Sequence, residues 1–186
     1  MESLGSNLID EQPIPDLLPY LRGRRSIRKF KPMPLPQEII DKIVEAGSWA
    51  PSAGNVQPWY LYLVLNLEVK KKLAQAALEQ HFVARAPLVI VVCADSSRAR
   101  SSYGMRGETL YSIQDTASLV QNMLLEAFSL GIGGCWVGAF REEEVKEALD
   151  MPHHLRPVAI LPFGYPDEKP GPRPRREIRE IVKVVA

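Results

Sequence analysis

The amino-acid sequence predicts an α+β layered sandwich. Segments with helical periodicity alternate with short apolar or β-branched segments typical of strands, and no segment is repeated. Several connections are too short or irregular for a simple doubly wound parallel sheet. The pattern therefore favours the α+β class, in which helices are layered on a sheet. The length of 186 residues suits one domain. We therefore divide the chain into an N-terminal arm, residues 1–16, and a single domain, residues 17–186.

The first half of the domain contains two predicted helices and two predicted strands. A short apolar segment leads into an arginine-rich cluster, and prolines at 32, 34 and 36 then keep the chain extended. Pro36 suits the first turn of a helix, whose apolar residues recur at helical spacing from Ile39 to Ala50. Aromatic and β-branched residues predict a strand over 59–65, followed by a helix over 67–80. The nearly uninterrupted apolar run over 87–94 predicts a strand buried on both faces.

The second half is built around the longest predicted helix, residues 108–130, which Gly131 stops. Residues 132–140 are glycine-rich and then resemble a strand. Three leading glutamates favour the positive N-terminal end of a short helix over 142–149. A strand over 158–163, a loop rich in proline and glycine over 164–174 and a basic tail over 173–179 complete the chain.

Composition excludes several classes of partner. The formal net charge of +1 gives no global electrostatic case for a nucleic-acid or membrane partner. The longest apolar runs are too short to span a bilayer, and no signal peptide is evident. The two cysteines, Cys93 and Cys135, lie in apolar surroundings and form no C-x-x-C pair, which indicates a reducing compartment. We therefore expect a cytoplasmic protein.

The sequence lacks the common catalytic and nucleotide-binding motifs. It contains no P-loop, no H-E-x-x-H, no paired cysteines and no G-x-S-x-G. The glycines at 131–134 begin like a dinucleotide fingerprint, but Trp136 occupies the third glycine position and the segment follows a helix. His153 and His154 have no third ligand nearby. We expect no metal site.

Two arginine clusters could hold an anion. Residues 24–28 read R-R-S-I-R, and the guanidinium groups with the intervening hydroxyl match the oxygens of a phosphate. Arg173, Arg175 and Arg176 lie on a loop that prolines stiffen. Taken alone, the spacing of the first cluster favours a solvated run of charge, and the second cluster is unremarkable.

Two further segments could contact a flat ligand. Small residues around Ser52, Asn55 and Gln57 allow close approach, and their polar groups suit the edge of a heterocycle. The glycines over 131–138 could leave backbone N–H groups free to point into a pocket. An ordinary helix-to-strand turn, and a helix cap followed by a buried strand, are the plainer interpretations.

Together and in order, these segments resemble the nitroreductase family of FMN enzymes, from about Leu17 to about Val182. The motifs that carry the resemblance are R-R-S-I-R at Arg24, A-P-S-A-x-N-x-Q-P-W at Ala50, G-I-G-G-C-W-V-G-A-F at Gly131 and L-P-F-G-Y-P-x-E-K-P at Leu161. The resemblance implies a mainly antiparallel central sheet flanked by helices, and an intertwined homodimer with two FMN sites at its interface.

The family pattern also assigns roles to individual residues. The phosphate of FMN would be held by Arg24, Arg25, Ser26 and Arg28, together with Arg173 or Arg175. The flavin would be contacted, from the other subunit, by Pro51, Ser52, Ala53, Asn55 and Gln57. The backbone of Trp136, Val137 and Gly138 would face the isoalloxazine, with an N–H group directed at its nitrogen N5.

The implied activity is transfer of a hydride from NAD(P)H through FMN to a small electrophilic acceptor by a ping-pong mechanism. The flavin carries this chemistry, so no protein nucleophile or metal is required. The acceptor is left open among nitro compounds, quinones, flavin and oxygen. Tyr103 and Arg106 are candidate substrate contacts, or else part of a surface loop. A dehalogenase or flavin-fragmenting enzyme of the same fold, and a non-enzymatic phosphate- or polyanion-binding module, are the alternatives.

Overall fold

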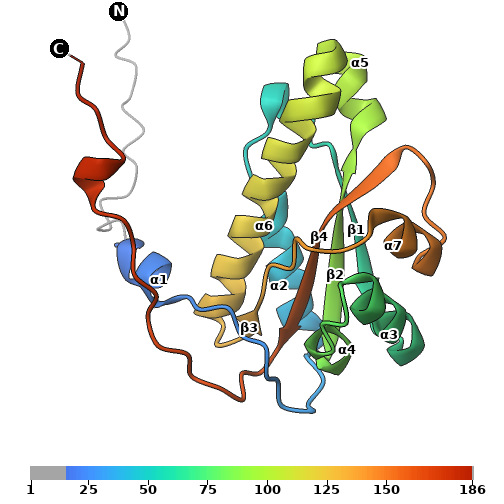
Figure 1. Ribbon diagram of the computed structural model, residues 1–186, viewed down its shortest axis with the longest axis vertical. Coiled ribbons are helices and arrows are strands. Elements are labelled where there is room, and N and C mark those ends of the chain that lie inside the picture. The colour runs from blue at the N-terminus through green and yellow to red at the C-terminus, as the bar shows by residue number, and fades with distance from the viewer. Residues whose placement is uncertain (1–15, 186) are drawn as a thin grey trace, which may run out of the picture.

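A four-stranded sheet with the order β1-β2-β4-β3 forms the centre of the computed structural model, which describes residues 16–185 (Figure 1). All three pairings between its strands are antiparallel. This confirms the predicted α+β class and the mainly antiparallel sheet. The predicted arm lies outside the described residues except for Asp16. The strands are β1 (Trp59–Val64), β2 (Leu88–Asp95), β3 (Gly133–Gly134) and β4 (Leu155–Gly164).

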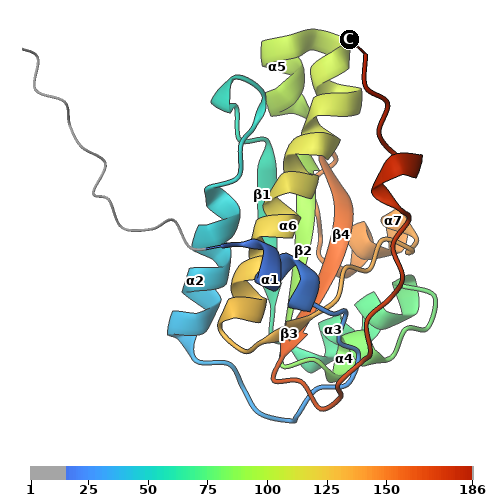
Figure 2. The same cartoon turned by 90° about the vertical axis from the view of Figure 1, so that its left-hand side faces the viewer.

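Helices cover both faces of this sheet (Figures 1 and 2). One face packs against α2 (Gln37–Ser48) and α6 (Ser112–Ser129), and the other against α3 (Leu67–Ala76), α4 (Phe82–Arg85) and α7 (Glu142–Ala148). Two apolar clusters result, one on each side of the sheet. No helix among residues 16–185 is both long enough and apolar enough to cross a bilayer.

Strand β2 is buried on both faces, as its apolar sequence predicts. Each residue from Leu88 to Ala94 is buried. Leu88, Ile90 and Val92 belong to the cluster under α2 and α6, and the alternate residues Val89, Val91 and Cys93 belong to the opposite cluster. Because side chains alternate along a strand, an uninterrupted apolar run is the pattern that a central strand between two helical layers requires.

Both ends of the described chain lie beside the sheet, and neither contributes one of its central strands (Figures 1 and 2). After α1 (Leu18–Gly23), the chain extends past β3, where Ser26 forms a parallel bridge with Gly134. After β4 the chain continues as a long extended tail that includes only the short helix η3 (Ile178–Glu180). Pro34 and Pro36 lie outside helices and strands, as expected, whereas Pro32 lies in a bend that the Met33 N–H group closes on the Lys31 carbonyl at 2.8 Å.

Three predicted elements differ from the structure. Helix α3 ends at Ala76 instead of Gln80, because Leu78 and Glu79 adopt positive φ angles of 57° and 60° that a helix cannot accommodate. The region around Tyr103 forms α5 (Ser96–Arg106), which is broken by non-helical angles at Tyr103 and Gly104, and the π-helical turn η2 (Gly107–Tyr111). The long helix α6 therefore begins only at Ser112. The strand expected within 132–140 shortens to β3, with one more bridge from Val137 to β4.

Candidate functional site

The arginine-rich segment is extended, so its side chains alternate between two sides of the chain. Arg24, Ser26 and Arg28 share the side of Cys135. Burial raises the pKa of the Cys135 thiol, and the charge of Arg28, the Ser26 side chain and the charge of Arg24 each oppose that rise. The structure therefore brings three of the predicted phosphate-binding side chains to one place.

The guanidinium groups on this side have the Glu168 carboxylate nearby but form no ion pair with it. Within residues 16–185, Arg24, Arg28 and Arg175 form no ion pair with a carboxylate. Burial lowers the pKa of Arg24, and the neighbouring charges of Arg175 and Arg25 lower it further. The guanidinium of Arg28 lies 5.8 Å from the centre of the Phe82 ring, which gives it a fixed support. A group of cations that no ion pair neutralises suits an anionic ligand.

The backbone of the same segment is held by Glu168, a residue that the sequence motifs contain but to which we had assigned no role. Its Oε1 accepts hydrogen bonds from the backbone N–H groups of Arg28 and Lys29, the second at 3.1 Å. Arg175, in the same C-terminal segment, lies near Arg24, whereas the contact found for Arg173 is its carbonyl, which accepts from Arg175 Nη1 at 3.3 Å. The C-terminal segment thus contributes both a brace and a cation to this place.

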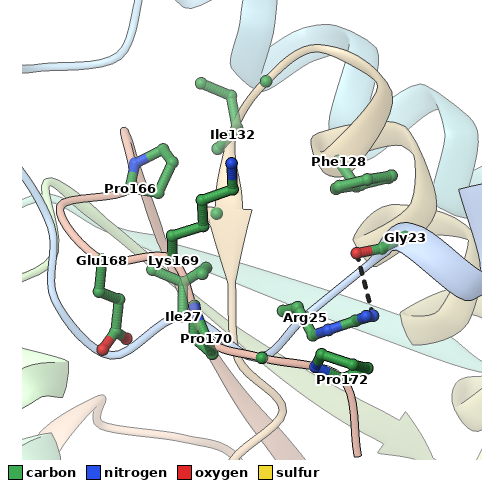
Figure 3. Close-up of a pocket in the computed structure, with 13 residues that line it drawn as sticks. Gly23, Arg25, Ile27, Phe128, Ile132, Pro166, Glu168, Lys169, Pro170 and Pro172 are labelled. Carbon is green, nitrogen blue, oxygen red and sulfur yellow. Dashed lines mark hydrogen bonds between the residues drawn. The ribbon is translucent and has the colours of Figure 1, made fainter.

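Arg25 points the other way. Its Nη1 donates to the carbonyl oxygens of Arg22, Gly23 and Arg24 at 2.6, 3.1 and 3.0 Å, and its Nε is buried without a partner in the described chain. It lines a largely apolar cavity of about 610 Å³ between the end of α6, β3 and the C-terminal segment (Figure 3). The neighbours of Arg25 in this cavity include Ile27, Phe128, Ile132 and Pro172.

The predicted flavin-contacting turn contains η1 (Ala53–Asn55) and an unusual run of backbone angles. Gly54, Asn55 and Gln57 have positive φ values of 52°, 57° and 54°. Ser52 Oγ accepts the N–H group of Gln57 at 3.0 Å, and Gln57 Nε2 donates to Asn55 Oδ1 at 3.1 Å. Glutamine rarely adopts such an angle, so the surrounding contacts must enforce the conformation.

Two side chains that the sequence analysis missed brace this turn from outside. Asp115 Oδ1, on the buried face of α6, accepts the N–H group of Ala53 at 3.2 Å. Arg98 Nε donates to the carbonyl of Val56 at 2.6 Å. Burial raises the pKa of Asp115, and the bond from Ala53 partly opposes this. A charged residue four positions before the buried Leu119 was the signal in the sequence that could have identified Asp115.

The two candidate substrate contacts lie beside the turn. The Tyr103 ring packs edge-on against Tyr111 with 5.4 Å between the ring centres, and its hydroxyl occupies the space that a Cβ at Gly54 would need. Arg106 Nε donates to the Tyr111 hydroxyl at 2.9 Å, and the guanidinium lies 5.3 Å from the centre of that ring. Tyr103 and Arg106 thus belong to a side-chain cluster on α5 and η2, at a point where Tyr103 and Gly104 depart from helical backbone angles.

The segment over 136–138 leaves backbone donors free. Val137 and Ile160 exchange two backbone hydrogen bonds of 3.0 Å, which pin the segment to β4. Within the described chain, the N–H groups of Trp136 and Gly138 have no hydrogen-bond partner. Gly138 borders a cavity of about 230 Å³, and the indole of Trp136 provides the nearest atoms to its missing Cβ, at 3.8 Å. The Gly138 N–H group is therefore available to a ligand.

The candidate residues of one chain fall into two distant groups. Gly134 pairs with Phe163, which pairs with Leu88, so the arginine segment lies at one end of β2. Trp59, directly after the turn, pairs with Ala94 at the other end. The rise from Leu88 to Ala94 is about 20 Å. Along β4, Ser26 lies about 10 Å from the segment of Gly138, since Gly134 pairs with Phe163 and Val137 pairs with Ile160. The turn of the same chain is not brought to the arginines.

No metal centre accompanies these residues. In the part of the chain that the structure describes, no group of three or more His, Cys, Asp or Glu side chains could hold a metal ion. The site offers cations at one end, free N–H groups next to them and, elsewhere in the chain, a rigid polar turn.

Comparisons with known proteins agree on one family. The model of the Nitroreductase family matches residues 21–84 and 77–165. A "Putative NADH dehydrogenase/NAD(P)H nitroreductase" of Methanothermobacter thermautotrophicus is 37% identical over 162 residues, covering 85% of this chain and 81% of the relative. An FMN reductase (NADPH) of Bacillus subtilis is 32% identical over 166 residues, covering 82% and 67%. The structure of the NADPH:FMN oxidoreductase from Vibrio harveyi, complexed with NAD+, superposes with a TM-score of 0.83 at 29% identity, covering 90% of this chain and 76% of that one.

Proposed function

Because the chain belongs to the nitroreductase family, we propose that it is an FMN-dependent oxidoreductase that takes reducing equivalents from NAD(P)H. The observation that carries this proposal is the alignment of unpaired guanidinium groups with the free N–H group of Gly138 along one strand, β4. From Phe163, opposite Gly134, to Ile160, opposite Val137, the strand rises about 10 Å. One elongated ligand with an anionic end and a polar ring suits this arrangement.

The phosphate of FMN would lie against Arg24, Ser26 and Arg28, with Arg175 completing the positive charge. These side chains share one side of the extended segment, and in the described chain Arg24, Arg28 and Arg175 form no ion pair with a carboxylate. For Arg25 to reach the same phosphate, its Nη1 would have to leave three backbone carbonyls. We therefore assign Arg25 to the support of α1, and place Arg175 ahead of Arg173.

The isoalloxazine ring would lie at Trp136, Val137 and Gly138. When bound, FMN supplies the hydride chemistry itself. The protein contributes an oriented donor, because the Val137–Ile160 bridge fixes the segment from which the Gly138 N–H group projects. A donor that is already fixed favours charge on the atom it faces without further reorganisation.

A second copy of the chain would complete the site. The rigid Ser52–Gln57 turn, with Pro51 and Ala53, lies about 20 Å from the arginines of its own chain. Trp49, just before the turn, is 80% exposed, and the extended tail exposes Ile178, Val182 and Val184. Apolar surface of this kind is typical of an obligate interface. An intertwined homodimer would bury it and bring the turn of one protomer to the FMN of its partner.

The acceptor would bind near the aromatic cluster of Tyr103, Arg106 and Tyr111, since this cluster supports the turn. Relatives named as FMN reductases and as nitroreductases make flavins and nitro compounds the first acceptors to test, with quinones and oxygen next. The free, buried thiols of Cys93 and Cys135 suit a reducing compartment such as the cytoplasm.

The decisive experiment is the absorption spectrum of the purified protein. We expect an oxidised flavin that chromatography identifies as FMN after denaturation and that NADH or NADPH bleaches anaerobically. FAD in place of FMN, or no flavin after reconstitution, would overturn the proposal. A colourless protein that retains polyanions would support the alternative of a phosphate-binding module.

A further inference from the structure

We infer that Glu142 and Arg156 form a clip that positions the Gly138 N–H group. The inference rests on the proposed function for its consequences at the flavin, but not for the mechanical coupling itself. Neither residue belongs to a motif that predicted the site. Both line the cavity that Gly138 borders.

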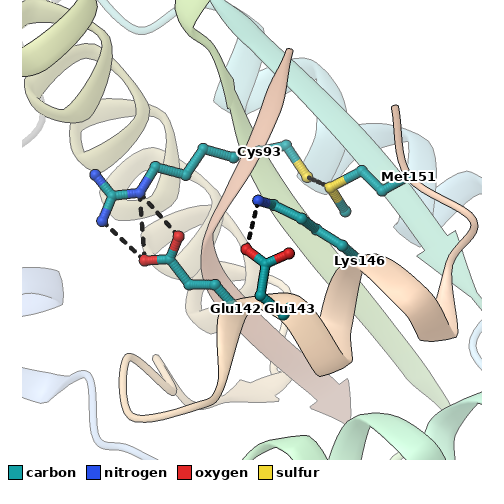
Figure 4. Close-up of polar contacts among 6 residues, drawn as sticks. Cys93, Glu142, Glu143, Lys146 and Met151 are labelled. Atoms are coloured by element: carbon teal, nitrogen blue, oxygen red, sulfur yellow. Dashed lines mark hydrogen bonds and ion pairs between the residues drawn. The ribbon is translucent and has the colours of Figure 1, made fainter. Parts of the chain in front are cut away.

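The contact between the two side chains is bidentate. Arg156 Nη2 lies 2.8 Å from Glu142 Oε1, and Arg156 Nε lies 3.0 Å from Glu142 Oε2 (Figure 4). This paired geometry fixes the guanidinium and the carboxylate relative to each other more tightly than a single contact does. The pKa of Glu142 is lowered and that of Arg156 is raised, in both cases chiefly by this hydrogen bonding.

The clip joins two elements of different rigidity. Arg156 lies in β4, where it pairs with Ala94 of the buried strand β2. Glu142 is the first residue of α7 and directly follows the connecting segment 138–141. The strand is thus the anchor, and the connecting segment is the part that the anchor holds.

The segment 138–141 is consequently attached to β4 at both ends. Before it, Val137 exchanges two backbone hydrogen bonds with Ile160, and after it, Glu142 binds Arg156. Two further attachments hold the segment elsewhere: the Arg141 N–H group donates to the Ala76 carbonyl of α3 at 2.9 Å, and Gln80 Nε2 donates to the Ala139 carbonyl at 3.4 Å. Loss of the clip should therefore loosen the segment without releasing it, and the direction of the Gly138 N–H group should become less defined.

The exposure of the Glu142 and Arg156 side chains sets the expected size of the change in local opening. The Arg156 and Glu142 side chains are 55% and 36% exposed, so water screens part of their attraction. We expect about a two- to fivefold change in the local opening of the segment, the range that a partly exposed ion pair supports.

The test compares Arg156→Met, Glu142→Gln and the double variant with Lys146→Met. Lys146 pairs with Glu143 at 2.8 Å within α7, so Lys146→Met removes an ion pair from the same helix without touching β4. The first readout is amide hydrogen exchange of Val137 and Arg141, the hydrogen-bonded neighbours of Gly138, in the protein as purified. The second is the rate of flavin reduction at saturating NAD(P)H, with the half-saturating concentration measured alongside.

Support for the clip has three parts. Exchange at Val137 and Arg141 accelerates two- to fivefold in both single variants, the double variant is no worse than either, and Lys146→Met matches the parent. Flavin reduction slows by a similar factor while the half-saturating concentration stays the same. Arg156→Lys retains the charge but cannot make the bidentate contact, so its exchange and reduction rates fall between those of Arg156→Met and the parent.

Unchanged exchange in the two single variants would overturn the clip, and so would an equal effect of Lys146→Met. If Arg156→Met lowers the yield of folded protein, Glu142→Gln reports on the same contact from the other side. Hydrogen exchange can be measured on a protein that binds no flavin. Absence of flavin would refute the proposed function, and the exchange rates would still show whether the clip exists.

Discussion

The carboxylate of Asp115 accepts a hydrogen bond from the backbone N–H group of Ala53 at 3.2 Å, and so joins the buried face of α6 to the turn that precedes β1. Asp115 as a whole is 8% exposed. A buried acceptor that holds a single backbone N–H group in a turn with three positive φ angles stabilises the conformation on which the proposed flavin contacts depend.

Removal of this acceptor should therefore disorder the turn. We expect Asp115→Ala to lower the free energy of unfolding by about 1–3 kcal/mol, because the Ala53 N–H group would lose its partner. FMN affinity should fall as well. Urea unfolding and flavin titration measure the two effects, and a variant with parental values in both would show that the contact is dispensable.

Asp115→Asn should behave differently and should depend on pH. Burial raises the pKa of Asp115 above its ordinary value of 3.8, so the folded protein binds the proton more tightly than the unfolded chain does. Stability from this group is then greatest at low pH and is lost as the pH rises from the ordinary value through the raised one. Asn keeps an acceptor oxygen without the charge. We expect Asp115→Asn to be at least as stable as the parent at pH 7, with its advantage vanishing toward pH 4 in urea unfolding. An advantage that grows in acid would contradict this sign.

Substitutions on the two sides of the arginine segment should have different effects. Arg24→Ala and Arg28→Ala should each weaken FMN binding about tenfold or more, the equivalent of a charge-assisted hydrogen bond of roughly 1.5–3 kcal/mol, with little loss of stability. Arg25→Ala should instead destabilise the protein, because the carbonyls of Arg22, Gly23 and Arg24 lose their donor. Equal effects of all three variants on FMN affinity would mean that side chains on the two sides of the segment do not differ in function.

Gly54 should be intolerant of a side chain for two separable reasons. Its φ of 52° disfavours any Cβ, by roughly 1–2 kcal/mol, and a Cβ there would also collide with the Tyr103 hydroxyl. Gly54→Ala should therefore cost more in the parent than in a Tyr103→Phe background, where the collision is relieved. Denaturant unfolding of the four proteins in this cycle gives the coupling, and an absence of coupling would show that Tyr103 moves aside freely.

The sharing of one site by two protomers predicts a complementation. A chain with Arg24→Ala and Arg28→Ala keeps a normal turn, and a chain with Asn55→Ala and Gln57→Ala keeps normal arginines. In a random mixture under two-fold symmetry, about a quarter of all sites should be intact, although each variant alone binds FMN poorly. Coexpression followed by flavin quantification measures this. No recovery in verified mixed dimers would place the whole site within one chain.

The sequence predicted the elements whose pattern is local and missed those that depend on distant contacts. Strand β2 was identifiable because burial between two helical layers requires an unbroken apolar run. Helix α5 was missed because its sequence, S-S-R-A-R-S-S-Y-G-M-R, has almost no apolar face and only Ala99 is buried. The alternation of Arg24 and Arg25 becomes evident only when the segment is seen extended beside β3. The bracing of Ala53 by Asp115 joins residues 62 positions apart, which no local pattern reports.

The Gly138 N–H group should orient the reaction. If the Gly138 N–H group is the donor to bound flavin, Gly138→Pro, which removes it, should slow flavin reduction about tenfold or more, or empty the site. Gly138→Ala is the matched control, because it keeps the N–H group and its Cβ would meet only the Trp136 ring, at an ordinary 3.8 Å. By contrast, the three histidines, His81, His153 and His154, are all exposed. Replacing each with Ala should leave the reduction rate within about an order of magnitude, roughly 1.4 kcal/mol of barrier. Anaerobic stopped-flow bleaching of the flavin distinguishes these outcomes. A histidine variant that keeps FMN but loses reduction would show that a proton-transferring side chain, and not the oriented backbone donor alone, controls the reaction.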